Sequence, residues 1–408
     1  MIGYSCRSCG ATLHTSFCDL GMSPLSNAFV APQRLGNGET FYPLQAFVCD
    51  SCFLVQLAEF ESPENIFGDY LYFSSFSTSW LDHAKRYVEE MTQKLSLGGS
   101  SQVVELASND GYLLQYFVAK GIPALGIEPA ANVAEVARAK GVPTHVDFFG
   151  AEVARRLRDD GKAADLLLGN NVLAHVPALN DFVEGIAILL KPDGRVTMEF
   201  PHLLRLIESN QFDTIYHEHF SYLSLTAVDT LFRRHGLVVV DVDELPTHGG
   251  SLRIHARHAA AAEIAPSVPA LLDREQAHGL RTIETYTSFD RQVQATKRAL
   301  LTFLIKAKSA GKSIVGYGAA AKGNTLLNFC GIRSDFVDYV ADRSPHKQGL
   351  YLPGTHIPVV APERIAETKP DYVLILPWNL REEIADQLAF VREWGGRFVV
   401  PIPNVQVF

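Results

Sequence analysis

The segment YHEHF, residues 216–220, gathers side chains that can transfer protons, bind a metal or donate hydrogen bonds. His217 and His219 flank Glu218, so the segment is a metal site, a proton-transfer centre or a polar strand edge. The two histidines are at i, i+2 and lack the i, i+4 spacing of H-E-x-x-H, and a catalytic zinc needs a third ligand. The spacing therefore disfavours a metal and leaves proton transfer or a structural polar segment open.

Two C-x-x-C pairs, CRSC and CDSC, lie near the N-terminus. Each pair can grip one metal ion through a tight turn, and two pairs complete a tetrahedral sulfur shell. Two redox motifs are the alternative, but a thioredoxin-like motif lies between a strand and a helix, whereas these pairs lie in short, turn-rich segments. The pattern predicts a structural Zn²⁺ held by Cys6, Cys9, Cys49 and Cys52.

The elements that position these groups are strands alternating with helices from residue 103 onward. Such alternation predicts an α/β fold with a mostly parallel sheet, which binds ligands at the carboxyl ends of its strands. Glu105 lies in the first expected strand, and Glu128 ends the second. A carboxylate at the end of the second strand can hold both ribose hydroxyls of a nucleoside.

The first strand leads into the turn ELASNDG, which lacks the G-x-G-x-x-G pattern that approaches a pyrophosphate. Its small residues still admit an adenosyl group, which favours S-adenosylmethionine over a nicotinamide dinucleotide. Acidic strand ends and small turn residues also occur in α/β domains of other functions. The remaining candidates for the cofactor site are Ser75, Ala107, Asn109, Gly111, Pro129, Asp147, Phe148, Asn170 and Asn171, with His175 nearby.

A second strand–turn–helix pattern, KSIVGYGAAAKGNTLLNFCG, lies near the C-terminus. Its small residues expose backbone N–H groups at a helix start, where phosphate binds well, although close packing of the helix on the strand also explains them. Two further strands end in polar or aromatic residues. We expect a second nucleotide pocket, for the substrate, with Gly316, Gly318, Ala319, Lys322, Asp342, Trp378 and Asn379 as candidates.

The whole chain resembles bacterial C-methyltransferases that act on nucleotide-linked 4-keto deoxysugars. The motifs that carry the resemblance are, in order, CRSCG…CDSC, YLYFSSFSTSW, VVELASNDG, IYHEHF, HGGSLR, GYGAAAKGNT, SPHKQGLYLPGTHIPV and LPWN. The resemblance implies a zinc-binding domain at 1–66, a class I S-adenosylmethionine methyltransferase domain at 67–260, and a helical linker with a Rossmann-like nucleotide-sugar domain at 261–408.

The resemblance also implies roles for individual residues. His219 matches the base of these enzymes, with Glu218 beside it, and His175 matches a histidine after the fourth strand. A tyrosine of these enzymes matches Tyr70, which opens the YLYFSS stretch, with Tyr72 as the neighbouring alternative. The hypothesis is that the base removes the proton on sugar C3, and that the resulting enolate attacks the sulfonium methyl. Tyr216 is a further candidate for stabilising the enolate oxygen, and Tyr222 for contacting the substrate.

The charge and composition of the chain limit its possible binding partners and its location. The net charge of −9 gives no sequence-wide basic footprint for nucleic acid. No apolar run approaches the roughly 20 residues of a membrane span, and the N-terminus has no signal-peptide pattern, so we expect a cytoplasmic enzyme. We expect a monomer or small homo-oligomer and, by resemblance, a dTDP-linked sugar.

Three other functions remain as alternatives. An NAD-linked nucleotide-sugar dehydrogenase or epimerase would use the C-terminal unit for its cofactor. A zinc-containing nucleotide-sugar-binding module would bind without turnover, and it leaves the clustered 216–219 side chains unexplained. An O- or N-methyltransferase would need no acidified C–H bond.

Overall fold

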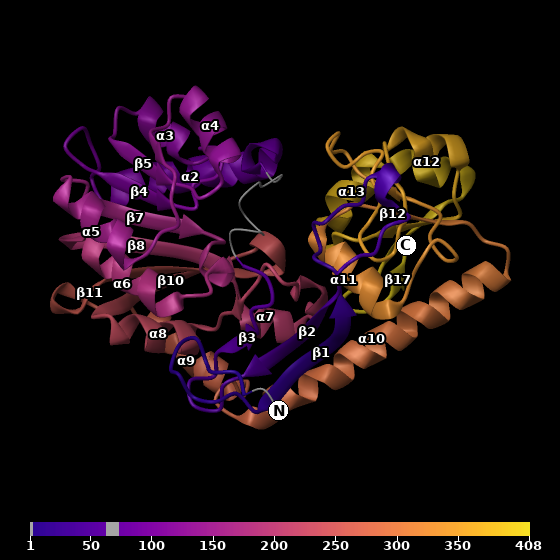
Figure 1. Ribbon diagram of the computed structural model, residues 1–408, viewed down its shortest axis with the longest axis horizontal. Helices are drawn as coiled ribbons and strands as arrows, with labels where there is room; N and C mark the ends of the chain where they lie inside the picture. Colours follow the sequence, from indigo (N-terminus) through magenta and orange to yellow (C-terminus); the bar gives the residue numbers. More distant parts are fainter. Residues whose placement is uncertain (1–2, 63–72) are drawn as a thin grey trace. The chain divides into compact units, whose positions relative to one another are not determined.

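The computed structural model describes residues 3–62 and 73–408, and the chain divides into two compact units (Figure 1). Unit 1 comprises Met1–Leu13, Cys49–Leu203 and Phe220–Arg281. Unit 2 comprises His14–Val48, Leu204–His219 and Thr282–Phe408. Each unit is therefore assembled from three separate stretches of sequence.

Unit 1 contains a seven-stranded sheet in the order β10-β11-β8-β7-β4-β5-β6. The five strands on one side are parallel, and β10 and β11 form an antiparallel edge. The bounds are β4 Val103–Leu106, β5 Ala124–Ile127, β6 Thr144–His145, β7 Ala164–Asn170, β8 Leu190–Pro201, β10 Leu237–Leu245 and β11 Ser251–His258. The predicted mostly parallel α/β sheet is confirmed.

Helices cover this sheet because each presents one apolar face. In α2 the buried residues Ala84, Tyr87, Val88 and Met91 recur at helical spacing and pack against the core around β4. Ser77 caps the helix by accepting a hydrogen bond from the Trp80 N–H at 3.3 Å. The helices of unit 1 are α2 Thr78–Lys94, α3 Leu114–Ala119, α4 Ala131–Ala139, α5 Ala151–Asp159, α6 Leu179–Leu189, α8 Leu225–Arg234 and α9 Ser267–Ala277.

A short antiparallel pair completes unit 1 beside the cysteine region. Strand β3 (Val55–Leu57) pairs with β9 (Ser221–Tyr222), with Val55 opposite Tyr222. Strand β9 begins two residues after His219, and β3 begins three residues after Cys52. The segment YHEHF and the second C-x-x-C pair thus lead into neighbouring strands.

Unit 2 contains a six-stranded sheet in the order β14-β13-β12-β15-β16-β17, parallel except for β17. Its strands are β12 Ile314–Tyr317, β13 Val340–Ala341, β14 Val359–Val360, β15 Tyr372–Ile375, β16 Arg397–Val400 and β17 Gln406–Val407. Its helices are α7 Leu203–Glu208, whose first residue falls in unit 1, α10 Ile283–Ser309, α11 Ala321–Cys330, α12 Glu363–Thr368 and α13 Arg381–Gln387. This is the expected second parallel α/β sheet.

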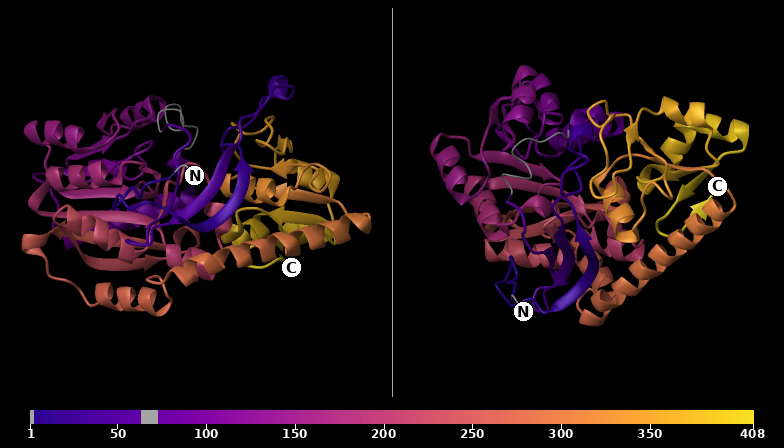
Figure 2. Two further views of the ribbon diagram at one scale, coloured as in Figure 1. Left: turned by 60° about the horizontal axis from the view of Figure 1, so that its bottom comes forward. Right: turned by 45° about the vertical axis from the view of Figure 1, so that its right-hand side comes forward.

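The hairpin of β1 (Thr15–Ser23) and β2 (Tyr42–Val48) also belongs to unit 2 and lies along the long helix α10, as Figure 2 shows. Phe17 stacks on Phe289 with ring centroids 4.7 Å apart and meets Tyr286 edge-on. These aromatic contacts give the apolar face of α10 a partner far away in sequence.

The division by compactness differs from the expected consecutive domains 1–66, 67–260 and 261–408. The β1–β2 hairpin and residues 204–219 belong with the C-terminal sheet, because their apolar side chains are buried there. The three-domain boundaries remain a prediction. Within the described residues, no helix is long and apolar enough to cross a membrane.

Candidate active site

A cavity of about 720 Å³ opens in unit 1 where β4, β5 and β7 end. Nine residues expected at the cofactor or catalytic site line it together, at the strand ends where α/β sheets bind ligands. They are Ala107, Asn109, Glu128, Pro129, Asp147, Phe148, Asn170, Asn171 and His175.

The turn after β4 is held in a conformation that brings backbone close to the cavity. Ala107 and Asn109 have φ angles of +53° and +49°, a left-handed region that costs energy for residues other than glycine. The Glu128 carboxylate accepts hydrogen bonds from the Asn109 N–H at 2.9 Å and the Ala130 N–H at 3.0 Å. Burial raises the pKa of Glu128, and these two backbone bonds oppose the rise.

Three residues expected at the cofactor site do not line this cavity. Glu105 is completely buried, and burial raises its pKa well above the usual value. Gly111 faces away, since a Cβ there would lie 3.0 Å from a methyl group of Val142. The Ser75 hydroxyl hydrogen-bonds the Asp110 carboxylate. The described structure therefore gives these three residues packing or turn-stabilising contacts.

An aromatic wall of the cavity was missed from the sequence. The Trp80 ring lies 6.0 Å from Tyr112 in a stacked arrangement and 5.4 Å from His248 in an edge arrangement. The Asn170 amide donates to the Tyr112 hydroxyl at 3.2 Å, and Asn171 contacts His248 at 3.1 Å. Trp80 is the last residue of the motif YLYFSSFSTSW and His248 is the first residue of HGGSLR, so the motifs held a usable signal.

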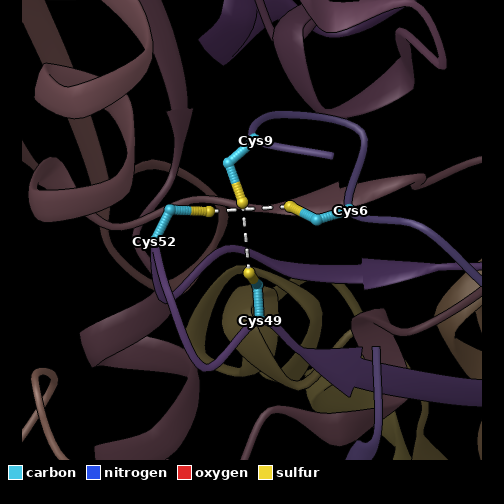
Figure 3. Close-up of side chains that lie close together, drawn as sticks. All are labelled: Cys6, Cys9, Cys49 and Cys52. Carbon is cyan, nitrogen blue, oxygen red and sulfur yellow. Dashed lines mark hydrogen bonds between the residues drawn. The ribbon is translucent and has the colours of Figure 1, made fainter. Parts of the chain in front are cut away.

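The four cysteines predicted to bind zinc converge at one point of unit 1, with their sulfur atoms turned toward one another (Figure 3). All four sulfurs lie within 4.8 Å of one another; Cys6 and Cys52 are 3.6 Å apart, and Cys9 and Cys49 are 3.4 Å apart. A tetrahedral ZnS₄ site with Zn–S bonds of about 2.3 Å separates its sulfurs by about 3.8 Å. The donor set and its spacing fit zinc.

Among residues 3–62 and 73–408, these cysteines are the only group of three or more potential ligands positioned for one metal ion. His217 instead contacts the Pro43 carbonyl at 3.2 Å and the edge of the Tyr42 ring. Burial lowers the pKa of His217, and its Nε2–H donates to this carbonyl. The metal interpretation of the 216–220 segment gains no support.

The other histidine of the segment has a defined tautomer. Its Nδ1 lies 2.9 Å from the Thr214 carbonyl, at the end of the 3-10 turn Phe212–Thr214. A carbonyl only accepts, so Nδ1 of His219 carries the proton and Nε2 presents its lone pair. The Tyr216 hydroxyl lies 2.9 Å from this Nε2 and donates to it. The pair lies within unit 2.

Glu218 is a buried carboxyl group, 5% exposed, beside this pair in sequence. The Asn27 amide donates to its Oε1 at 2.5 Å. Burial raises the pKa of Glu218 to about 7, against the opposing effects of Asn27 and Lys347. A carboxyl with this pKa changes its charge near neutral pH.

The second turn, between β12 and α11, is tightly packed. Gly318 has φ +88°, and a Cβ there would lie 2.5 Å from Pro377; a Cβ on Gly316 would lie 2.8 Å from Val340. The Ala319 N–H, a candidate phosphate donor, hydrogen-bonds the Asp342 carboxylate at 2.7 Å. Close packing therefore accounts for both glycines, and the expected phosphate contact remains a prediction.

The remaining substrate candidates are placed as follows. The Lys322 ammonium donates to Asn379 at 2.7 Å and lies over the Trp378 ring, 4.8 Å from its centroid. Tyr222 is buried in β9 and does not line the 720 Å³ cavity. Tyr70 and Tyr72 lie outside the described residues.

Three known protein families match successive parts of this chain. Residues 6–67 match a zinc binding domain family, residues 80–242 a methyltransferase domain family, and residues 246–403 the C-methyltransferase C-terminal domain family. C-methyltransferase NovU from Streptomyces niveus is 38% identical over 403 residues, 98% of this chain and 96% of that protein.

Other matches are partial. The ubiquinone biosynthesis O-methyltransferase of Chelativorans sp. (strain BNC1) is 30% identical over 94 residues, 23% of this chain and 37% of that protein. The solved structure of magnesium protoporphyrin IX methyltransferase (ChlM) from Synechocystis PCC 6803 with bound SAH superimposes with a TM-score of 0.36 at 13% identity, covering 48% of this chain and 92% of that chain. The NovU match alone among these three extends over nearly the whole chain.

Proposed function

Because the chain belongs to the S-adenosylmethionine-dependent C-methyltransferases, we propose that its acceptor is a nucleotide-linked 4-keto deoxysugar, probed first as the dTDP sugar, which is methylated at C3. The resemblance of the eight motifs supports this acceptor, and the second parallel sheet supports a separate nucleotide site. The observation that carries the proposal is the hydrogen-bonded Tyr216–His219 pair with its fixed tautomer.

The cavity residues fit S-adenosylmethionine, which supplies an electrophilic methyl group on a sulfonium. Glu128 would hold the ribose hydroxyls with the lone pairs that its two backbone donors leave unused. Asp147 and the partly exposed ring of Phe148 would hold the adenine, and Asn170 and Asn171 would hold the methionine end. A zinc ion on the four cysteines would be structural, because four sulfur ligands leave no open position for chemistry.

His219 is the base in this proposal. A ketone at C4 acidifies the proton on C3, and a neutral imidazole suits its removal near neutral pH. The proton passes to Nε2, the ring nitrogen whose lone pair is available because Nδ1–H is held by the Thr214 carbonyl. The electron pair left on C3, delocalised onto the 4-keto oxygen, then forms the bond to the methyl carbon, while the methyl–sulfur bond breaks and its electron pair stays on sulfur.

Tyr216 has two successive roles. Without substrate its hydroxyl donates to Nε2 of His219 and keeps the lone pair hydrogen-bonded. Once the sugar C3–H takes that position, the same hydroxyl is released to donate to the enolate oxygen, as charge develops there. Glu218 and His175 complete the proposed catalytic set, by holding a sugar hydroxyl and by stabilising the enolate.

The experiment is mass spectrometry of a panel of dTDP-4-keto sugars incubated with the protein and S-adenosylmethionine. We expect one methyl group on carbon, together with exchange of the C3 proton in D₂O even without the methyl donor. His219→Asn should abolish both the exchange and the transfer, while the matched change His217→Asn should retain the exchange. Methyl transfer to oxygen, or full exchange by His219→Asn, would reject the proposed base and acceptor carbon.

A further inference from the structure

Arg7, inside the first C-x-x-C pair, makes contacts that zinc binding does not require. Its side chain leaves the cysteine turn, and Nη1 donates to the Pro177 carbonyl at 3.0 Å. Nη2 donates to the Leu57 carbonyl, and the guanidinium lies over the Phe220 ring, 5.3 Å from its centroid. All of these partners belong to unit 1. A charged, part-buried side chain thus links the cysteine turn to the loop after β7.

Hydrogen bonds also run in the opposite direction, from the start of α6 to the cysteine turn. The Asn180 amide, in the first turn of α6, donates to the carbonyls of Arg7 and Ser8 at 2.9 and 3.0 Å. Its oxygen contacts His235 at 3.0 Å, which fixes the orientation of the amide. The cysteine turn and the start of α6 are therefore tied by donors from both sides.

The tied loop is a wall of the cavity assigned to the methyl donor. His175, Val176, Pro177 and Ala178 all line the cavity. The carbonyl that Arg7 binds therefore belongs to a lining residue, two positions after His175. A shift of the loop would change the shape of the cavity directly.

On the other side, the Gln56 side chain links the backbone of Arg7 to one of the predicted zinc ligands. The Arg7 N–H donates to the Gln56 side-chain oxygen at 2.9 Å, and the Gln56 amide donates to the Cys6 sulfur at 3.2 Å. Outer contacts of this kind hold metal ligands in place. A Zn(Cys)₄ site would also carry two negative charges, and the neighbouring guanidinium would offset one of them.

We propose that Arg7 is a positioning residue for the methyl-donor site, through which the zinc-bound turn holds the Pro177–Ala178 wall and sets the affinity for the donor. The inference depends on the cavity and the zinc site, and not on the sugar or on His219. By thermodynamic reciprocity, a ligand in the cavity must then strengthen zinc retention.

The test is calorimetric titration of the zinc-loaded protein with S-adenosylhomocysteine. Arg7→Ala loses charged hydrogen bonds to backbone carbonyls, and we expect its Kd to rise about tenfold, with zinc content unchanged. Arg7→Lys keeps the charge and one donor, and should recover part of the affinity. Arg86→Ala, which removes an exposed arginine of α2, should match the wild type. Wild-type affinity in Arg7→Ala would overturn the proposal.

A second measurement uses the unaltered protein, so that it does not depend on the folding of any variant. The affinity for zinc is measured by equilibrium competition with a chromogenic chelator, with and without saturating S-adenosylhomocysteine. We expect the ligand to lower the apparent Kd for zinc, because a ligand that binds more tightly to the zinc-loaded protein must raise its affinity for zinc by the same factor. Equal Kd values for zinc would show that the zinc turn and the cavity are not coupled.

Discussion

At the scale of single residues, the environment rather than the residue type decides what each acidic side chain can do. Glu128 is held at the cavity by two backbone donors, so its carboxylate is oriented before a ligand arrives. Glu105, 23 positions earlier and inside β4, is buried where its charged form is disfavoured. Glu218 lies between these cases, with one amide donor and a pKa near neutrality.

Glu218 gives the protein a pH-dependent stability. Its pKa is raised from 4.5 to about 7, so the folded state binds the proton more tightly than the unfolded chain does. The free energy of unfolding should therefore fall as the pH rises from 4.5 to about 7, and this contribution should stay constant above that range. Glu218→Gln, which stays neutral, should remove a fall of roughly 3 kcal/mol.

Urea unfolding of the two proteins at several pH values across this window measures the effect. Glu393→Gln, which changes an exposed carboxyl group of the same unit, serves as the control and should follow the wild type. Parallel stability curves for wild type and Glu218→Gln would contradict the assignment.

At the scale of elements, the two strand–turn–helix motifs have similar sequences but differ in how their turns are built and in what the turns contact. The turn after β4 keeps two non-glycine residues in the left-handed region beside a cavity. The turn after β12 uses glycines to let the chain pass close to Pro377 and Val340. The first turn therefore borders a cavity, and the second packs closely against its neighbours.

The packing role of Gly318 predicts a large cost for one added methyl group. Gly318→Ala meets both a positive φ and Pro377, whereas Gly331→Ala meets a positive φ of +70° with no atom within 4 Å of the new Cβ. Gly331→Ala should cost about 1 kcal/mol for its backbone conformation, and Gly318→Ala about 1–3 kcal/mol more for overpacking. Urea unfolding followed by tryptophan fluorescence compares the two, and equal costs would refute the packing argument.

Local patterns predicted the features that depend on neighbours in sequence. The alternation of apolar runs and helices indicated both parallel sheets, and the C-x-x-C spacing indicated the four-sulfur site. The aromatic wall could not be found in this way, because Trp80, Tyr112 and His248 meet only when distant strand ends come together. The burial of Glu105 follows from the position of β4 in the interior of the sheet, where residues on both faces of the strand are buried, and this position depends on the order of the strands.

At the scale of the whole molecule, the zinc site closes a loop in the chain. Cys9 and Cys49 are 40 positions apart, and the β1–β2 hairpin lies between them. A cross-link that closes a loop of this length lowers the conformational entropy of the unfolded chain. The metal thus stabilises the fold beyond the few residues that it touches.

Removing zinc should therefore destabilise the protein broadly. By analogy with a disulfide over a loop of about 40 residues, we expect a loss of about 4 kcal/mol. Thermal unfolding with and without a chelator should show a lowered Tm, and proteolysis of the chelated protein should begin within residues 10–48. Added zinc should reverse both effects; an unchanged Tm after complete zinc removal would exclude a stabilising metal.

The interleaving of the two units has a consequence for how the protein is made. The chain passes between units five times, after Leu13, Val48, Leu203, His219 and Arg281. The ribosome synthesises the chain from its N-terminus, so β1 and β2 appear early. Helix α10 and the six-stranded sheet of the same unit appear last. At about 5–20 residues per second, the hairpin waits on the order of 10–60 s for its partners. During that interval its apolar face is open to chaperones or to other nascent chains.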